Sequence, residues 1–374
     1  MVVSAGVVMS APFIRDIRDF IKTTFPGQYV KVVAAAIAIV IGGSVVLALI
    51  RIRDRRAARY GAIAAALLLG TAYSLWNAQG IVEVDTVERF HFVEYGLIAL
   101  LFYRAFQPAQ DISTILLPIV AGLIVGTFEE WLQWFIPGRV GDMRDVFLNG
   151  AAILCGLLFS LGVDPPDRFS FSMSPASRRR TGFVAAAATI VFAAFVHTVH
   201  LGSEINDPEA GRFRSLYDGE TLVALSRARE ASWKAAPPIQ RPSSLSREDQ
   251  YLNEGFLHAQ ERNTRWTAGD FTSAWFENRI LEKYYAPFLD TPSYISKTGL
   301  RWPDPQRVDA EQRYRSAGSP AASGFESRAD AAEGKHFIRV WPKAVFWTVV
   351  LILVGQFLFF ATRAPRRVAA ATTL

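Results

Sequence analysis

Long apolar stretches separated by short charged segments recur along most of the chain. A helix that spans a membrane needs about 17–25 predominantly apolar residues, so length without charge is the informative property. Seven stretches meet or approach this requirement: 31–50, 60–78, 90–106, 112–127, 146–163, 181–199 and 344–362. The pattern therefore predicts an all-α, multi-pass membrane protein with about seven transmembrane helices.

Residues 1–30 precede these stretches and follow a different pattern. Apolar residues recur at helical spacing between charged ones, at Phe13, Ile14, Ile17, Phe20 and Ile21. This spacing is typical of an amphipathic helix that lies on a membrane surface. A signal peptide is not expected, because residues 1–12 lack a basic segment.

The distribution of these features predicts six regions. They are an amphipathic segment (1–30), a first span with a basic loop (31–58), a transmembrane domain (59–163), a cytoplasmic loop with the sixth span (164–200), a mainly helical extracytoplasmic region (201–342) and a last span with a cytoplasmic tail (343–374). The fifth region is an insertion between the last two spans.

The composition agrees with a membrane protein, because 51% of the residues are hydrophobic and only 20% are charged. The net charge of +6 could indicate a nucleic-acid surface. Residues 201–342, however, hold 19 Lys or Arg and 20 Asp or Glu, so the excess lies beside the apolar stretches. We expect no nucleic-acid partner. A single Cys excludes a disulfide framework and a Cys-cluster metal site, and no cofactor is expected.

Arginines indicate how the spans are oriented, because positively charged loops resist translocation. They follow the first, fifth and seventh stretches, at Arg51, Arg53, Arg55, Arg56 and Arg59, at Arg168 and Arg178 to Arg180, and at Arg363, Arg366 and Arg367. These loops are predicted to be cytoplasmic. The N-terminus and residues 201–342 are then predicted to lie outside.

The outer region is predicted to hold three helices. Asp218 can cap a helix that ends near Ala235, Ser246 begins a second, and Gly269-Asp270 precedes a third rich in aromatic residues. Long regular elements are not expected in residues 290–334. Acidic and histidine side chains also occur at helical spacing, and we expect solvated helix faces for them: Glu254, His258, Glu261, Glu277 and Glu282.

Two polar clusters lie at predicted membrane boundaries, where ionisable side chains are costly and seldom incidental. The first is 88–95, and the second runs from 129 to 149. The predicted topology puts both at the same depth on the outer face. Helical spacing places His91 near Glu94 and Tyr95, Glu129 and Glu130 near Gln133, and Asp145 near Asn149.

These residues predict an outward-facing polar pocket. Its candidate ligand-binding residues are His91, Glu94, Tyr95, Glu129, Glu130, Gln133, Arg139, Asp145 and Asn149. Paired carboxylates and an imidazole can hold or move protons, and a turn at Pro137-Gly138 could bring Arg139 back to clamp a phosphate or carboxylate. The alternative is a structural salt-bridge network in which Arg139 neutralises Glu130 or Asp145. No residue is assigned a catalytic role.

The same motifs resemble VanZ-like membrane proteins, a family named for a teicoplanin-resistance protein. The resemblance covers about residues 60–162 and rests on Glu129-Glu130-x-x-Gln133, Pro137-Gly138-Arg139, Asp145-x-x-x-Asn149, Gly156 and an earlier His91-x-x-x-Tyr95. Glu129, Asp142 and Ala152 depart from the usual residues. The resemblance implies a multi-pass protein of the bacterial cytoplasmic membrane linked to glycopeptide tolerance or cell-surface polymers.

Two functions remain open at this point. In the first, the pocket binds a lipid-linked or peptidoglycan-related anionic ligand, with or without a reaction. In the second, the chain is a non-catalytic scaffold that contacts envelope proteins through residues 201–342, and membrane lipids are its other partners. His197-x-x-His200 could hold a metal, although a metal-free pair at the membrane surface is the commoner arrangement.

Overall fold

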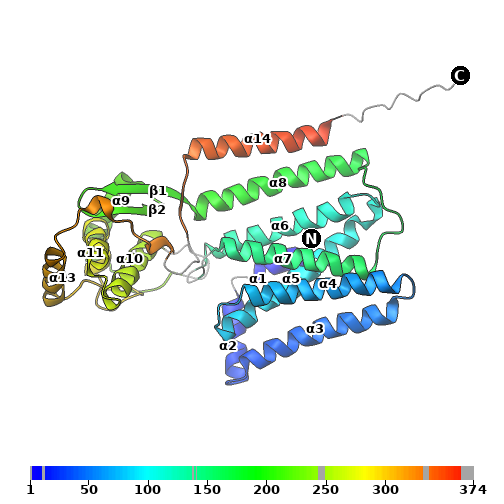
Figure 1. Ribbon diagram of the computed structural model, residues 1–374, viewed down its shortest axis with the longest axis horizontal. Coiled ribbons are helices and arrows are strands. Elements are labelled where there is room, and N and C mark those ends of the chain that lie inside the picture. Colours follow the sequence, from blue (N-terminus) through cyan, green and yellow to red (C-terminus); the bar gives the residue numbers. More distant parts are fainter. Residues whose placement is uncertain are drawn as a thin grey trace. The chain divides into compact units, whose positions relative to one another are not determined.

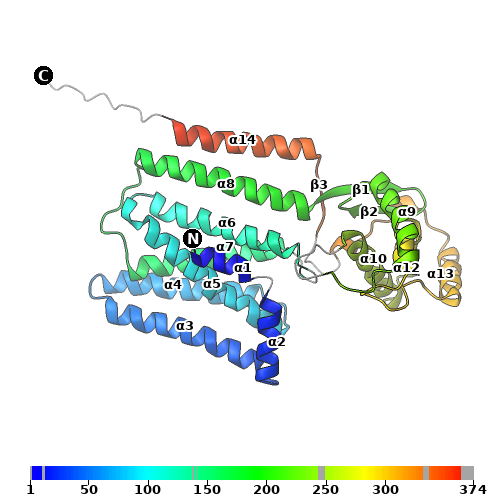
Figure 2. The ribbon, with the colours of Figure 1, turned by 180° about the vertical axis from the view of Figure 1, so that it is seen from behind.

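The computed structural model describes residues 2–10, 13–136, 139, 141–242, 249–331 and 337–363. These residues are mostly helical (Figures 1 and 2). They divide into two compact units. Unit 1 comprises 1–132, 143–194 and 347–374, and unit 2 comprises 133–142 and 195–346.

Seven long helices coincide with the seven apolar stretches. They are α3 (Tyr29–Arg51), α4 (Arg56–Trp76), α5 (Val82–Phe106), α6 (Ser113–Gln133), α7 (Met143–Val163), α8 (Pro175–Val199) and α14 (Lys343–Thr362). Within the described residues, α3, α6, α7, α8 and α14 are long and apolar enough to cross a membrane. α4, whose first turn holds Arg56 and Arg59, and α5, which carries several charged residues, do not meet this requirement, so the total of seven spans remains a prediction.

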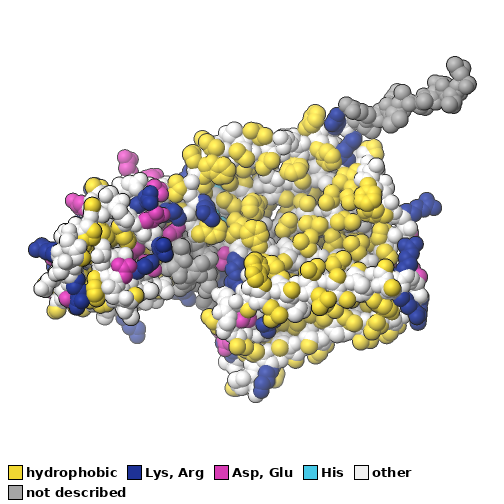
Figure 3. Space-filling view, viewed as in Figure 1, with side chains coloured by type: hydrophobic (Ala, Val, Ile, Leu, Met, Phe, Trp, Pro, Cys, Tyr) yellow, Lys and Arg dark blue, Asp and Glu magenta, His cyan; other side chains and the backbone are white. Residues whose placement is uncertain are grey.

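The surface of unit 1 has the character of a membrane protein. Hydrophobic side chains cover most of its visible face, and Lys and Arg side chains gather near the α3–α4 and α7–α8 loops (Figure 3). Large apolar side chains on these helices are exposed, Ile39 by 73% and Leu68 by 70%. In water such a surface would be unfavourable, whereas lipid tails cover it without cost.

Two short helices precede the spans. They are α1 (Val2–Ser10) and α2 (Ile14–Thr24), and α2 is amphipathic. The apolar side chains of Phe13, Ile17 and Phe20 are exposed, while Lys22 donates to Glu83 of α5 across 2.7 Å. Within the described part of the N-terminal segment, α2 therefore combines exposed apolar side chains with charged ones.

Close backbone contact joins α5 to α7. A β-carbon added at Gly156 would lie 2.5 Å from Gly96 Cα and 2.8 Å from Gly96 O, so only glycine fits there. The apolar core beside this contact holds Tyr95, Ile98 and Ala99 of α5, together with Ala152 and Ile153 of α7. Small residues permit this spacing, and close packing is the main attraction between helices in lipid.

Polar side chains of α4 and α5 bind backbone carbonyl groups at the C-terminal end of α7. The Arg59 guanidinium donates to the carbonyl oxygens of Gly162 and Val163 at the end of α7, and Tyr103 donates to Asp164 O at 2.6 Å. These bonds satisfy carbonyl groups that a helix C-terminus leaves without partners. The end of α7 is therefore attached to both α4 and α5.

Asp111 serves two helix starts at once. Its Oδ1 accepts from Ser113 N at 2.9 Å, and its Oδ2 accepts from Ser174 N at 3.0 Å. The first bond caps α6, and the second lies one residue before α8. Burial alone would raise the pKa of Asp111, but the hydrogen bonds from Ser113, Ser177 and Ser174 outweigh it and lower the pKa.

Unit 2 combines a small sheet with helices. Its strands are β1 (Leu201–Asp207), β2 (Gly211–Ser215) and β3 (Arg339–Val340), in the order β2-β1-β3. β1 pairs antiparallel with β2 and parallel with β3. Its helices are α9 (Gly219–Ala235), α10 (Gln250–Thr267), α11 (Phe271–Tyr284), α12 (Ala286–Asp290) and α13 (Asp304–Ser316), with short 3-10 turns at Ala322–Gly324 and Ala329–Ala331.

The helices of unit 2 begin where aspartates cap them. Asp218, Asp249 and Asp270 accept hydrogen bonds from backbone N–H groups at the starts of α9, α10 and α11. The predicted cap at Asp218 is confirmed, and Asp270, which the sequence placed before the third helix, caps α11. The predicted start at Ser246 lies outside the described residues. Aromatic side chains of α11 enter the core as expected, with Tyr284 and Tyr285 packed among Phe213, Tyr251 and Phe288.

The prediction of an all-α fold is correct in that the described residues are mostly helical, but it missed the three-stranded sheet of unit 2. A second expectation for this region was wrong. The segment 290–334 contains α13, a helix of 13 residues. α13 is polar along its length and buries only Ala310, so it lacks the apolar periodicity on which the prediction relied.

Asp207 links β1 to α11 in unit 2. Its Oδ2 accepts from Lys283 Nζ at 2.8 Å and from Tyr284 Oη at 2.7 Å. Its Oδ1 accepts from the backbone N–H groups of Glu209 and Ala210. Burial would raise the pKa of Asp207, but these donors outweigh it and lower the pKa from 3.8 to about 2.

We predict that Gly156→Ala destabilises unit 1, because the new methyl group meets the backbone of Gly96. Such overpacking typically costs about 1–3 kcal/mol. Gly150→Ala is the control on the same helix, since its β-carbon would make an ordinary 3.4 Å contact with Leu123. Thermal unfolding of the purified variants should show a lower midpoint for Gly156→Ala alone. Equal midpoints would contradict the close contact.

Asp207 gives unit 2 a defined acid sensitivity. A lowered pKa stabilises the fold above the unfolded value near 4, and this stabilisation is lost as the pH falls towards 2. We predict that Asp207→Asn lowers stability at pH 7 by about 1.5–3 kcal/mol and flattens the decline between pH 4 and pH 2. Thermal unfolding across this range tests both effects. Asp304→Asn, at an exposed carboxylate, should leave the profile unchanged.

Candidate functional site

A buried hydrogen bond joins α5 to α6 and links the two polar clusters that the sequence singled out. Tyr95, fully buried on α5, donates its hydroxyl proton to Glu129 Oε2 on α6. Glu94 is the neighbour of Tyr95 on α5, and Glu130 is the neighbour of Glu129 on α6. Glu129 is 5% exposed and Glu130 is 0% exposed. Several carboxyl groups are therefore gathered within an apolar helix bundle.

Asn149 of α7 adjoins this group. A β-carbon added at Gly126 would lie 3.0 Å from Asn149 Cβ and 3.2 Å from Tyr95 Cε1, so the two side chains flank the same glycine of α6. Asn149 is fully buried, yet neither its Oδ1 nor its Nδ2 has a hydrogen-bond partner among the residues that the structure describes. A buried amide without partners costs roughly 1–3 kcal/mol.

His91, Glu94 and Asp145 are the remaining candidate residues of unit 1. The His91 ring stacks on the Tyr95 ring with centroids 6.1 Å apart, and its buried Nδ1 has no partner in the described part of the chain. Glu94 precedes Tyr95 on α5. Asp145 is half-buried in the first turn of α7 and makes no hydrogen bond or ion pair with the described residues.

Gln133 and Arg139 form a separate pair in unit 2. Arg139 donates to Gln133 Oε1 through Nε at 3.1 Å and through Nη2 at 2.6 Å. The Arg139 backbone N–H bonds to Ile136 O, which closes a turn. The predicted turn residues, Pro137 and Gly138, lie outside the described residues.

The sequence did not identify Arg144 as the arginine that joins the two clusters. Arg144 of α7 donates to Glu88 Oε2 of α5 at 2.9 Å and to Asn77 Oδ1 and O, just after α4. Gln79 Nε2 also donates to Glu88, at 2.6 Å. Both Arg144 and Glu88 lie within the clusters that the sequence singled out, so opposite charges at one predicted membrane boundary were the available signal.

A second buried acid–base group lies in unit 2, where we expected solvated helix faces. That expectation was wrong, because Glu254, His258, Glu261 and Glu277 are all at most 6% exposed. His258 Nδ1 lies 2.7 Å from Glu277 Oε2, and Ser327 donates to Glu277 Oε1. Helical spacing alone could not show this, because the partners come from α10, α11 and the segment after α13.

Neither group forms an evident metal centre. Among the described residues, no set of three or more His, Cys, Asp or Glu side chains could hold a metal ion. His200 bonds to Phe337 O through Nδ1 at 3.0 Å and stacks on the Phe337 ring. Burial lowers the pKa of His200, which favours a neutral ring.

The arrangement in unit 1 suits polar recognition. Asn149 offers both a donor and an acceptor, and His91 Nδ1 offers one or the other according to its tautomer. The carboxyl group of Glu129 is held by Tyr95, which fixes its position. A ligand's polar group could satisfy the buried amide, and the carboxyl groups beside it could accept hydrogen bonds or hold protons.

Comparison with known proteins agrees with the motifs. Residues 73–163 match a family model described as VanZ/LLP1. The match includes the C-terminal end of α4 and all of α5, α6 and α7. No curated protein and no solved structure matches the chain.

We predict that Tyr95→Phe destabilises unit 1, because Glu129 loses a buried hydrogen-bond donor. Hydrogen bonds to charged groups contribute about 1.5–3 kcal/mol. Tyr60→Phe is the control, since Tyr60 on α4 makes no hydrogen bond with the described residues. The thermal unfolding midpoint should fall for Tyr95→Phe and stay unchanged for Tyr60→Phe. An unchanged midpoint in both would mean that the Tyr95–Glu129 bond does not stabilise the helix bundle.

Proposed function

Because residues 73–163 form a VanZ-like domain of a membrane protein, we propose that this domain binds a ligand. The ligand is lipid-linked or related to the cell wall, and it is anionic. Its polar group is bound at the buried site of Tyr95, Glu129 and Asn149. A site between membrane helices can receive a lipid-linked molecule directly from the bilayer, because the helices around it are exposed to lipid.

One observation carries this proposal: the amide of Asn149 is fully buried and has no partner in the described residues. A structural asparagine would be expected to bond to its neighbours, since an unsatisfied buried amide destabilises the fold. If the amide binds a ligand, the unsatisfied amide destabilises only the protein without ligand, and ligand binding removes this free-energy cost. The neighbouring carboxyl groups and His91 would then select the ligand by its hydrogen-bonding groups.

The negative charge of the ligand is the second part of the proposal. Arg139 is the candidate cation that the sequence motif suggests, and its Nε and Nη2 donate to Gln133. Guanidinium groups bind phosphates and carboxylates well. We further propose that ligand binding is linked to teicoplanin tolerance, in a protein of the bacterial cytoplasmic membrane.

The alternative is a non-catalytic scaffold that contacts envelope proteins through unit 2. One observation favours it: unit 2 has its own hydrophobic core, built around Phe213, Leu222, Tyr251 and Tyr285. A scaffold would not need the Asn149 amide. The two functions therefore differ in what they require of this one residue.

We predict that Asn149→Leu raises the stability of the protein and abolishes its function. Leucine has a similar size and removes two unsatisfied polar atoms, so the thermal unfolding midpoint should rise. Teicoplanin tolerance of bacteria that express the chain should fall to the level of cells without it. Mass spectrometry of lipids extracted from the purified protein should also show the loss of a bound species.

Ser160→Ala is the matched control, because Ser160 is a buried polar residue of the same helix whose hydroxyl already bonds to Gly156 O at 2.6 Å. It should retain both tolerance and the bound lipid. Full tolerance in a stabilised Asn149→Leu variant would reject the binding site and favour the scaffold. Arg139→Ala tests the anionic part, and unchanged binding would show that the ligand does not need this cation.

A further inference from the structure

Unit 2 contains a polar cavity that is independent of the site in unit 1. Its volume is about 900 Å³, within the range of small-molecule sites. Side chains from β2, α10, α11 and the segment after α13 line it. Its charged and hydroxyl groups are Arg214, Glu261, Arg265, Ser273, Glu277, Glu326, Ser327, Arg328 and Asp330, and Phe325 adds an aromatic ring.

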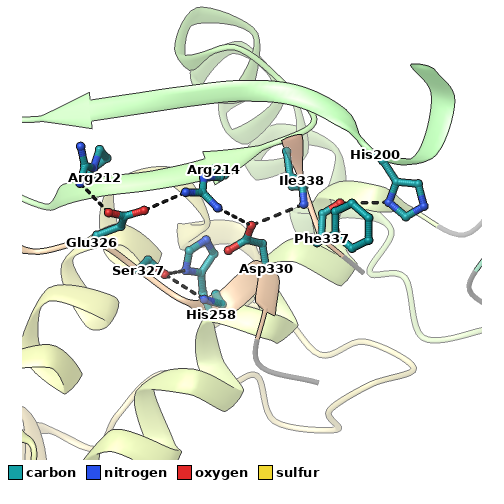
Figure 4. A network of polar contacts seen from close by, with 10 residues as sticks. His200, Arg212, Arg214, His258, Glu326, Ser327, Asp330, Phe337 and Ile338 are labelled. Atoms are coloured by element: carbon teal, nitrogen blue, oxygen red, sulfur yellow. Dashed lines mark hydrogen bonds and ion pairs between the residues drawn. The ribbon is translucent and has the colours of Figure 1, made fainter. Parts of the chain in front are cut away.

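Ion pairs fix the charged groups of this cavity (Figure 4). Arg214 lies between Glu326, at 2.8 Å, and Asp330, at 3.5 Å, and Asp330 also accepts from Ile338 N. On α10, Arg265 Nε donates to Glu261 Oε1 at 2.7 Å. Groups that are already held in place lose little conformational freedom when a ligand binds.

The buried acid–base group supports one wall of the cavity. Glu277 lines the cavity and accepts from both Ser327 and His258, so both of its oxygens are held. A carboxylate has about four lone-pair positions, which leaves room for a ligand donor. Ser327 bonds in addition to Ala329 N, and His258 packs between the rings of Phe213 and Tyr285.

The cavity also presents donors and acceptors that make no bond with the described residues. Glu261 Oε2, Arg265 Nη2 and the Ser273 hydroxyl make no hydrogen bonds with the described residues, and Arg328 makes no ion pair with them. The ring of Phe325, stacked on Phe276 with centroids 5.0 Å apart, provides an apolar face. A ligand that fits must offer many hydroxyl groups and also C–H surface.

The cavity holds both signs of charge, which disfavours a strongly ionic occupant. Carboxylates already bind Arg214 and Arg265, and the acidic side chains of the lining, which outnumber the arginines, would repel a phosphate. A cation would meet the same guanidinium groups. Neutral polyhydroxyl compounds donate to carboxylates and accept from guanidinium groups without breaking either ion pair. We propose that the cavity of unit 2 binds a neutral saccharide, with Glu261, Glu277, Ser273 and Arg328 on its hydroxyl groups and Phe325 against its C–H face.

The test uses the full chain in lipid nanodiscs, which avoids detergents with sugar head groups. Cellobiose, maltose and diacetylchitobiose are offered as neutral probes, and inorganic phosphate as an anionic probe. Saturation-transfer NMR and calorimetry measure binding. At least one disaccharide should bind, and Ser273→Ala and Arg328→Ala should each weaken it roughly fivefold, as expected for one lost hydrogen bond.

Two controls match these variants in chemistry and lie outside the cavity. Ser316→Ala and Arg307→Ala, both on α13, should bind the disaccharide as the unmodified chain does. Asn149→Leu should also bind it, which separates this cavity from the proposed site in unit 1. The proposal is wrong if no disaccharide binds the folded protein, if both cavity variants bind normally, or if phosphate binds in place of the sugars.

Discussion

The close contact between α5 and α7 is the constraint on which the polar site of unit 1 depends. Gly156 lets the backbone of α7 reach Gly96 of α5, and Tyr95 is the residue next to that contact. With the helices at this distance, Asn149 of α7 and Tyr95 of α5 both reach Gly126 of α6. In lipid, where apolar surfaces gain little from leaving the solvent, such packing is a main source of helix association. A minor change in the spacing of two backbones would therefore displace the polar groups of three helices.

The two units bury charge in different ways. Unit 1 places Glu129, Glu130 and Asn149 among apolar helices, where the Tyr95 hydroxyl group donates to Glu129. Unit 2 buries Glu254 and Glu277 beside donors from several elements, which include Ser215, Tyr285, His258 and Ser327. Buried carboxyl groups with several donors hold a fold in one arrangement.

The sequence was most informative about features that depend on residues close together in the chain. The long helices follow from apolar stretches, and Asp218 and Asp270 marked helix starts because a cap acts within three residues of the chain. The sheet could not be predicted, since β3 has two residues and pairs with a strand more than a hundred residues earlier. Burial of His258 and Glu277 was also missed, because identical spacing occurs on solvated helices. The pairing of Arg144 with Glu88 needs the fold, although both clusters were evident from their charges.

Asp111 has a consequence for how the protein is made. Its two carboxylate oxygens bind the starts of α6 and α8, and the backbone groups that they receive are 61 residues apart, at Ser113 and Ser174. During synthesis the first bond can form as soon as α6 emerges, but the second must wait until α7 has been completed and the chain has turned back. This order has a structural result: the α5–α6 loop, which contains Asp111, reaches its final structure only after α6 and α7 are in place.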